Sequence, residues 1–209
     1  MRPELPQSIR AFIAVNLPDD VLDRVGQVQA ELKPAARGGA VRWAAAGQIH
    51  LTLKFLGNIA SASLPELEAA LHRAGAGINP FELRAEGLGG FPDLQRPRVL
   101  WAGLAGELSS LHALQTNVLR ETEAWGKPEE RAFHAHLTLG RVKDCRPREL
   151  RELLAKIESM PAPQLGRWLV NEIHLMRSEL SPDGSRYTCL ARIALASALP
   201  NGARFPGDG

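Results

Sequence analysis

The stretch IHLTLKFLG at residues 49–57 alternates apolar and polar residues as a β-strand does, and it places a histidine, His50, inside that strand. The tetrapeptide HLTL occurs again in AHLTLGR at residues 135–141, where the histidine is His136. Because side chains alternate along a strand, each histidine shares a face with the threonine two residues later, Thr52 or Thr138. A hydrophobic core accounts for the leucines but not for polar residues directed the opposite way in both copies.

The two strands occupy matching places in two halves of the chain, at about 9–91 and 98–180. Each half is predicted to run strand, helix, His-Leu-Thr-Leu strand, helix, strand. The predicted helices cover residues 18–33, 61–75, 107–125 and 146–159, and the other predicted strands cover 9–17, 81–91, 98–104, 168–180 and 185–195. A repeat at the same point of two matching orders indicates an internal duplication.

These patterns predict an α+β fold with one bilobal, pseudo-symmetric domain over residues 8–199 and a loose tail over 200–209. We expect one lobe from each half, and hence two antiparallel or mixed sheets that flank a central cleft, with helices on the outside. The two histidine strands would then face each other across the cleft.

Two imidazoles can carry the two halves of one proton-transfer reaction, because near neutral pH one ring can accept a proton while the other donates one. Displacement at phosphorus uses this division, since the attacking and leaving oxygens lie roughly in line. The hydroxyl groups of Thr52 and Thr138 can donate to the phosphate oxygens beside each ring. The paired motifs therefore predict a phosphoryl-transfer site with His50 and His136 as its acid and base.

Further residues are candidates for contacts with an anionic substrate. Lys54 and Arg141 follow the two motifs and could neutralise the phosphate. Arg177, on a predicted strand, could meet phosphate or form a surface salt bridge. Arg10, which begins the first strand, has weaker support, and Phe12 on the same face could stack on a nucleobase or pack in the core. His174 has no threonine two residues later, so we expect it to be structural.

The composition is that of an ordinary globular protein: 209 residues, 44% hydrophobic and 23% charged, with a formal net charge of +2. No apolar run approaches the ~20 residues of a membrane span, and the N-terminus carries no secretory cleavage site. Neither Cys145 nor Cys189 belongs to a Cys-x-x-Cys pair. We therefore expect a cytoplasmic monomer without a membrane or protein partner.

The motifs resemble those of the two-histidine (2H) phosphoesterase superfamily, and within it the RNA 2′,3′-cyclic phosphodiesterases, which are also called 2′-5′ RNA ligases. The resemblance covers roughly residues 9–195, in blocks that occur in order. These blocks are RAFIAV (10–15), HLTLKFLG (50–57), PRVLWAGL (97–104), HLTLGR (136–141) and LMRSEL (175–180). A lone His-x-Thr motif is weak evidence, whereas two of them within these blocks are specific.

The resemblance implies that the protein opens a terminal 2′,3′-cyclic phosphate on RNA to a 2′-phosphomonoester, with no metal or other cofactor, and that it could run the reverse 2′-5′ ligation. By position, it makes His50 the general acid and His136 the general base, with Thr52 and Thr138 holding the phosphate. In one departure, the family's proline before the second histidine is replaced by Ala135, and the preceding His134 lies on the face of His136. We expect His134 to influence His136 or the preference for a nucleotide.

Two other classes of function remain open at this point. His134 and His136 have the spacing of strand metal ligands, with His50 as a possible third, although neither motif contains an acidic residue. A module that binds RNA ends without turnover would keep the same cleft. Survival of activity in EDTA argues against the first class, and turnover of a cyclic mononucleotide argues against the second.

Overall fold

The computed structural model describes residues 5–128, 132–143, 147–181 and 184–195, so Cys145 and the predicted tail at 200–209 lie outside the described residues. Within these ranges the fold is α+β, as predicted from the sequence. The α-helices are α1 (Asp19–Leu32), α2 (Leu64–Gly75), α3 (Leu108–Glu121) and α4 (Pro147–Ser159). The strands are β1 (Ser8–Val15), β2 (Val41–Trp43), β3 (Leu51–Ala60), β4 (Phe81–Phe91), β5 (Val99–Gly106), β6 (His136–Val142), β7 (Gln164–Val170), β8 (Glu172–Ser181) and β9 (Gly184–Ala194).

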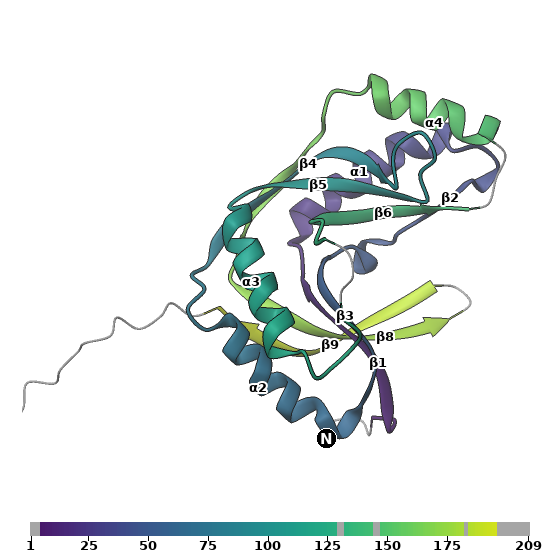
Figure 1. Cartoon of the computed structure of the whole chain (residues 1–209). Helices are drawn as coiled ribbons and strands as arrows, with labels where there is room; N and C mark the ends of the chain where they lie inside the picture. Colours follow the sequence, from purple (N-terminus) through teal and green to yellow (C-terminus); the bar gives the residue numbers. More distant parts are fainter. Residues whose placement is uncertain (1–4, 129–131, 144–146, 182–183, 196–209) are drawn as a thin grey trace, which may run out of the picture.

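All these strands join one antiparallel sheet in the order β7-β4-β5-β6-β3-β1-β8-β9, with β2 added on β6. The two central strands, β3 and β6, pair only through Leu51 and Leu137, so the sheet consists of two half-sheets that meet at one point. The prediction of two separate sheets is therefore wrong in detail. The histidine strands are neighbours that diverge from this pair, and Figure 1 shows the half-sheets spreading apart on one side of it.

The two half-sheets do not coincide with the two halves of the sequence. Strand β4 ends the first half of the chain but pairs with β5 of the second, and β8 of the second half pairs with β1 of the first. The strand order is nevertheless symmetric about the β6–β3 junction when β1 is matched with β5 and β8 with β4. Each lobe thus contains strands from both halves, which corrects the expected one-half-per-lobe arrangement. The duplication itself stays a prediction.

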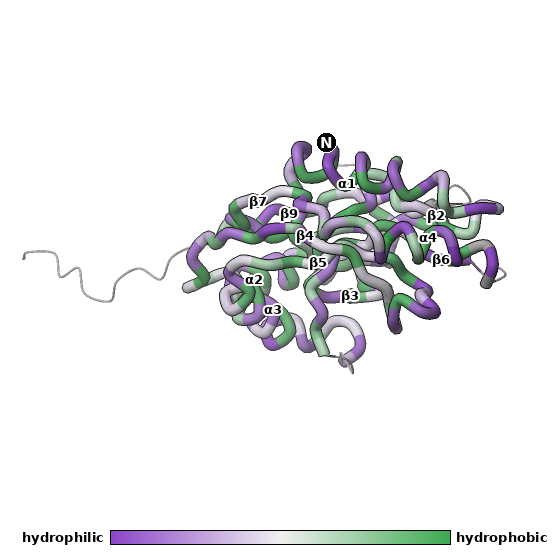
Figure 2. The backbone as a smooth tube through the Cα atoms, turned by 90° about the horizontal axis from the view of Figure 1, so that it is seen from above, coloured by the Kyte–Doolittle hydropathy of each residue, from purple (hydrophilic) through white to green (hydrophobic). Residues whose placement is uncertain are grey.

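The helices lie on the outer faces of the sheet, with α1 and α4 over one half-sheet and α2 and α3 over the other (Figure 1). Helix α1 shows why: Asp19 and Asp20 in its first turn complement the helix dipole, and Val21, Val25 and Leu32 recur on one buried face. Figure 2 shows the same alternation of hydrophilic and hydrophobic colour along α1, α2 and α3. The core therefore lies between the helices and the sheet, and the opposite face of the sheet is left for the site.

Two further features correct or extend the sequence analysis. The strand predicted over 168–180 is two strands, β7 and β8, because the chain leaves one half-sheet at Asn171 and enters the other. Asn171 still takes part in the fold, since its carbonyl oxygen accepts a hydrogen bond from the backbone of Leu195.

Among the described helices, none combines the length and apolarity needed to cross a membrane.

Candidate active site

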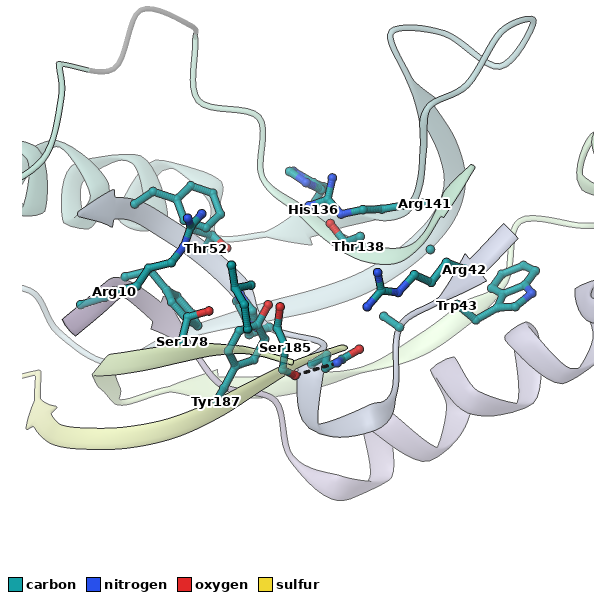
Figure 3. A pocket seen from close by; sticks show the side chains of 18 residues that line it. Arg10, Arg42, Trp43, Thr52, His136, Thr138, Arg141, Ser178, Ser185 and Tyr187 are labelled. Atoms are coloured by element: carbon teal, nitrogen blue, oxygen red, sulfur yellow. Dashed lines mark hydrogen bonds between the residues drawn. The ribbon is translucent and has the colours of Figure 1, made fainter. Parts of the chain in front are cut away.

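A pocket of about 490 Å³ opens where the two half-sheets diverge, a volume within the range of small-ligand sites. Its walls come from β1, β3, β8 and β9 on one side and from β2 and β6 on the other, and no residue of the four α-helices lines it. The lining side chains that can form hydrogen bonds are Arg10, Arg42, Trp43, Gln48, His50, Thr52, His136, Thr138, Arg141, Ser178, Ser185 and Tyr187. The two histidine–threonine motifs, 86 residues apart in the sequence, thus converge on one cavity (Figure 3).

His50 lies against two aromatic rings. The Phe12 ring stacks on the imidazole with centroids 4.7 Å apart, and the Tyr187 ring meets it edge-on at 5.2 Å. Burial lowers the pKa of His50 to about 4, although its hydrogen bond to the backbone carbonyl of Gln48 favours the charged form. A positive charge on His136 lowers the pKa of His50 further, so the two rings are close enough to interact electrostatically.

His136 is held by the chain that precedes it. Its Nδ1 lies 2.6 Å from the carbonyl oxygen of His134 and must donate, because a carbonyl only accepts; this leaves Nε2 as the nitrogen available for proton transfer. The Phe91 ring contacts the imidazole edge-on at 4.9 Å. Burial lowers the pKa of His136, and the positive charges of His134 and Arg141 lower it further.

Thr52, Thr138 and Arg141 all line the pocket, and their predicted contacts with a substrate stay a prediction. Figure 3 shows Thr138 and Arg141 close to His136 on the β6 side. Neither threonine hydroxyl forms a hydrogen bond with another described residue, so both can donate to a ligand. Each imidazole therefore has a hydroxyl donor on its own strand, and the β6 side adds a guanidinium group.

The predicted place of Lys54 beside Thr52 is wrong, because β3 contains a bulge between them. Thr52 pairs with Ala14 of β1, whereas Lys54 pairs with Ile13, which faces the core. Lys54 is only 5% exposed, and its Nζ donates to the carbonyl and hydroxyl oxygens of Thr122 at the end of α3. The lysine thus stabilises the packing of α3 on the sheet instead of lining the pocket.

Of three other predicted residues, only Phe12 lines the pocket, and Arg177 and His134 lie outside its lining. Arg177 pairs with Ala11, so it points away from the pocket face, and it forms an ion pair with Glu179 at 2.8 Å. Phe12 does line the pocket, but its buried ring packs on His50. His134 lies outside the lining residues and acts on His136 through its carbonyl oxygen and its charge.

The structure adds residues that sequence reasoning missed or ranked low. Arg10 lines the pocket because it shares the face of Phe12 on β1, and the cross-strand partner of Arg10, Ser178, lines it too. Arg42 enters through the three-residue strand β2, where it pairs directly with Arg141. Alternation along β1 could have identified Arg10, whereas no local signal distinguishes Arg42 from any exposed arginine.

Two glutamine side chains support the walls of the pocket. The half-buried Gln48 amide donates to the carbonyl oxygen of Ser185 at 2.7 Å, which ties the turn before His50 to strand β9. The buried Gln29 amide, on α1, donates to the carbonyl oxygens of Ala44 and Leu139 at 2.9 and 2.8 Å. Leu139 directly follows the lining residue Thr138, so this contact fixes the backbone of the second motif.

The chemistry of the pocket is that of an acid–base site for an anion. Among the described residues that line it there is no carboxylate, and none of the described His, Cys, Asp and Glu side chains form a group of three that could hold a metal ion. The lining instead offers two imidazoles, three guanidinium groups and the hydroxyls of two threonines, two serines and one tyrosine, together with the Gln48 amide and the Trp43 indole. Such a set, with two proton-transfer groups and several donors to an anion, fits acid–base chemistry at a phosphate ester.

Comparisons with known proteins agree. Residues 15–101 and 105–187 match the family described as LigT like Phosphoesterase. The RNA 2′,3′-cyclic phosphodiesterase of Methanothermobacter thermautotrophicus is 35% identical over 181 residues, which cover 86% of this chain and 95% of that protein. The chain therefore belongs to the LigT-like phosphoesterase family, a family of enzymes, and the resemblance found in the sequence is confirmed.

Solved structures show the same fold. A crystal structure of a Thermus thermophilus protein, 30% identical in sequence, superposes with a TM-score of 0.70 over 90% of this chain and 98% of that one. The structure of E. coli LigT complexed with 3′-AMP, 26% identical, superposes with a TM-score of 0.68 over 90% of this chain and 98% of that one.

Proposed function

We propose that the protein hydrolyses the terminal 2′,3′-cyclic phosphate of RNA to a 2′-phosphomonoester, without a metal ion. The observation that carries this proposal is the convergence of both histidine–threonine motifs on one carboxylate-free pocket with three arginines. Family members named RNA 2′,3′-cyclic phosphodiesterase at 35% and 34% identity support the activity. The 3′-AMP complex of E. coli LigT supports a nucleotide as the ligand of this pocket.

In the proposed reaction His136 is the general base and His50 the general acid. The Nε2 of His136 takes a proton from a water molecule, whose oxygen forms a bond to phosphorus. The bond from phosphorus to the ribose 3′-oxygen breaks on the opposite side, and His50 gives this oxygen its proton. Thr52 and Thr138 donate to the non-bridging oxygens, while Arg141 balances their charge. Each histidine ends in the opposite protonation state and exchanges its proton with solvent before the next turnover.

Binding of the substrate would change the protonation state of His50. Burial keeps the ring neutral at pH 7, with a pKa of about 4, whereas a general acid must carry a proton. A phosphate anion next to the ring favours the charged form and so raises this pKa. Binding of the substrate would therefore charge the acid at the point where its proton is needed.

The decisive experiment uses an RNA oligonucleotide that ends in a 2′,3′-cyclic phosphate, incubated with and without EDTA. Equal formation of a 2′-phosphomonoester in both samples, identified by ³¹P NMR, supports the proposal. Loss of turnover in EDTA and its return with added metal would instead show a metal-dependent hydrolase. Binding of the RNA without turnover under either condition would show a module that reads RNA ends.

Ligation is a second candidate, favoured by Arg42 and Arg141. These two arginines lie beside His136, on the side from which the nucleophile attacks, and a 5′-hydroxyl RNA strand could place its first phosphate between them. The reaction is the reverse of opening a 2′-5′ linkage to the cyclic phosphate. Mixing a cyclic-phosphate RNA with a 5′-hydroxyl RNA tests this candidate, because a joined product must carry a 2′-5′ linkage that resists ribonucleases specific for 3′-5′ bonds.

A further inference from the structure

The pocket holds more positive charge than the proposed reaction needs. A cyclic phosphate carries one negative charge, whereas Arg10, Arg42 and Arg141 all line the pocket, and no described lining residue is acidic. Like charges on directly paired residues, such as Arg42 and Arg141, are unfavourable unless an anion compensates them. Figure 3 shows Arg10 on the opposite side of the pocket from this pair, with Thr52, Tyr187 and His136 between. The charge therefore forms two separate groups.

Arg10 lies along the strand that supports the general acid. On the pocket face of β1 the order of residues is Ala14, Phe12 and Arg10, and Phe12 stacks on His50. Two residues of extended strand span about 7 Å, so Arg10 begins one such step beyond the ring that holds His50. This step is similar in length to one nucleotide of an extended RNA strand. Arg10 is exposed and forms no ion pair with any other described residue.

The surface around Arg10 has the mixed character of a single-stranded RNA site. Its cross-strand partner, Ser178, adds a hydroxyl donor to the same wall. Phe55 and Leu180 also line this end of the pocket, and they are 57% and 71% exposed although both are large and apolar. Proteins that bind single strands combine a cation for the phosphate with apolar faces on which bases stack.

We propose that Arg10 and Ser178 bind the phosphate that joins the last two nucleotides of the substrate, so that the enzyme prefers an RNA chain to a cyclic mononucleotide. This inference rests on the proposed function. The direction follows from the chemistry: the leaving 3′-oxygen receives its proton from His50, so the terminal ribose lies on the His50 side. The chain must continue from that ribose, and β1 with Arg10 is the next basic surface on this side.

The test compares three substrates: adenosine 2′,3′-cyclic phosphate, the dinucleotide ApA with a terminal cyclic phosphate, and the same dinucleotide with a neutral methylphosphonate in place of the internucleotide phosphate. We expect the dinucleotide to exceed the mononucleotide in kcat/KM by about tenfold, mainly through KM, because a charge-assisted hydrogen bond of this kind contributes at least that much. The methylphosphonate should lose this advantage. A mononucleotide or methylphosphonate that reacts as well as the charged dinucleotide would overturn the inference.

The variant Arg10→Ala identifies the residue. It should lower kcat/KM about tenfold more for the dinucleotide than for the mononucleotide. For the methylphosphonate, the loss in kcat/KM should be no larger than for the mononucleotide. The matched control is Arg24→Ala, which removes an exposed arginine of α1 outside the pocket and should leave all three substrates unchanged. An equal loss of kcat/KM on all three substrates would mean that Arg10 acts at the reacting phosphate or stabilises the fold. If only Arg42→Ala abolished the preference for the dinucleotide, the RNA chain would instead lie along the Arg42 side of the pocket. Either result overturns the inference.

The salt dependence gives an independent measurement. One more phosphate contact on a single strand steepens the plot of log(kcat/KM) against log[salt] by about 0.7. The wild-type protein should show this difference between dinucleotide and mononucleotide, and Arg10→Ala should show none. Failure of the proposed function is distinct from failure here, because in that case the wild-type protein would open none of the three cyclic phosphates.

Discussion

His50 directly precedes strand β3 and His136 begins strand β6, so the two rings lie at matching ends of the central strands, and their local contacts are similar. Each ring is hydrogen-bonded to the backbone carbonyl two residues earlier, that of Gln48 or His134. Each is followed after one leucine by a threonine that lines the pocket. The surroundings differ, however: His50 packs against the rings of Phe12 and Tyr187, which also contact each other, whereas His136 contacts Phe91 and lies close to the positive charge of Arg141.

These surroundings explain how one repeated motif can supply two opposite roles. The lowered pKa of His50 has burial as its largest cause, and an anion bound against the ring opposes that effect. For His136 burial also comes first, but the charges of His134 and Arg141 add to it and belong to the protein itself. A bound phosphate therefore favours protonation of His50, whereas the Arg141 guanidinium continues to disfavour protonation of His136. This difference matches the proposed acid and base.

The largest expected effects come from removing either ring. His50→Ala and His136→Ala should each lower kcat at least ~10²-fold while the fold is retained, because each ring supplies half of the proton transfer. His72→Ala, at an exposed position of α2 outside the pocket, is the control and should keep full activity. Steady-state kinetics with circular dichroism spectra check this, and wild-type turnover in either variant would contradict the paired roles of the rings.

The threonines should matter less than the rings they accompany. Thr52→Ala and Thr138→Ala should each lower kcat about tenfold, or ~1.4 kcal/mol of transition-state stabilisation, because one hydroxyl donor to the phosphate is lost. The serine variants keep the hydroxyl and should recover most of the rate. Unequal losses at the two positions would show on which side of the phosphorus more charge develops.

The pH dependence should separate the two rings. Both free-enzyme pKa values lie below the ordinary 6.5, so the form with one charged and one neutral ring is most abundant below pH 6.5. The bell-shaped plot of kcat/KM should therefore have its maximum below pH 6.5 and fall as the pH rises through the upper pKa, when both rings become neutral. The limbs of kcat, measured with bound substrate, should lie at higher pH.

Substitutions of the neighbours test the two environments separately. Tyr187→Ala admits water to His50 and should raise its pKa from about 4 towards 6.5, while Arg141→Gln removes a cation and should raise the pKa of His136. Histidine titrations by NMR measure each shift separately. If either variant moved both rings equally, the two environments would not be independent.

The smallest expected effect on activity concerns Lys54, which follows the first motif but lies in the core. Lys54→Met should keep kcat within about twofold of the wild type and lower the free energy of unfolding by about 1–3 kcal/mol, because the buried oxygens of Thr122 lose a donor. Urea denaturation measures the second quantity, and the exposed Lys127→Met is the matched control. A large loss of kcat in a stable Lys54→Met protein would return this residue to the site.

The sequence sufficed for the features that depend on local periodicity. Helices α2 and α4 and strand β4 begin and end within three residues of their predicted bounds, because their apolar spacing is strong and turn residues flank them. The four residues His50, Thr52, His136 and Thr138 could be found because two copies of one motif are improbable as core residues.

The remaining features depend on contacts between distant segments. The bulge that turns Lys54 into the core exists only because β3 pairs with β1, and strand alternation alone puts this lysine on the wrong face. Arg177 fails in the same way, through its pairing with Ala11. Arg42 reaches the pocket on the short strand β2, which is positioned by its pairing with β6. The exchange of β4 and β8 between the lobes depends on which strands pair, and the sequence of a single segment does not determine this pairing.

The single pair between Leu51 and Leu137 has a mechanical consequence. Each leucine directly follows a histidine of the proposed acid–base pair, so the point where the central strands join is also a fulcrum placed next to both rings. If the lobes rotated about this point, Arg10 and Arg42, which lie further from it, would move more than the two imidazoles. Nucleotides could then enter and leave while the spacing of acid and base stays constant.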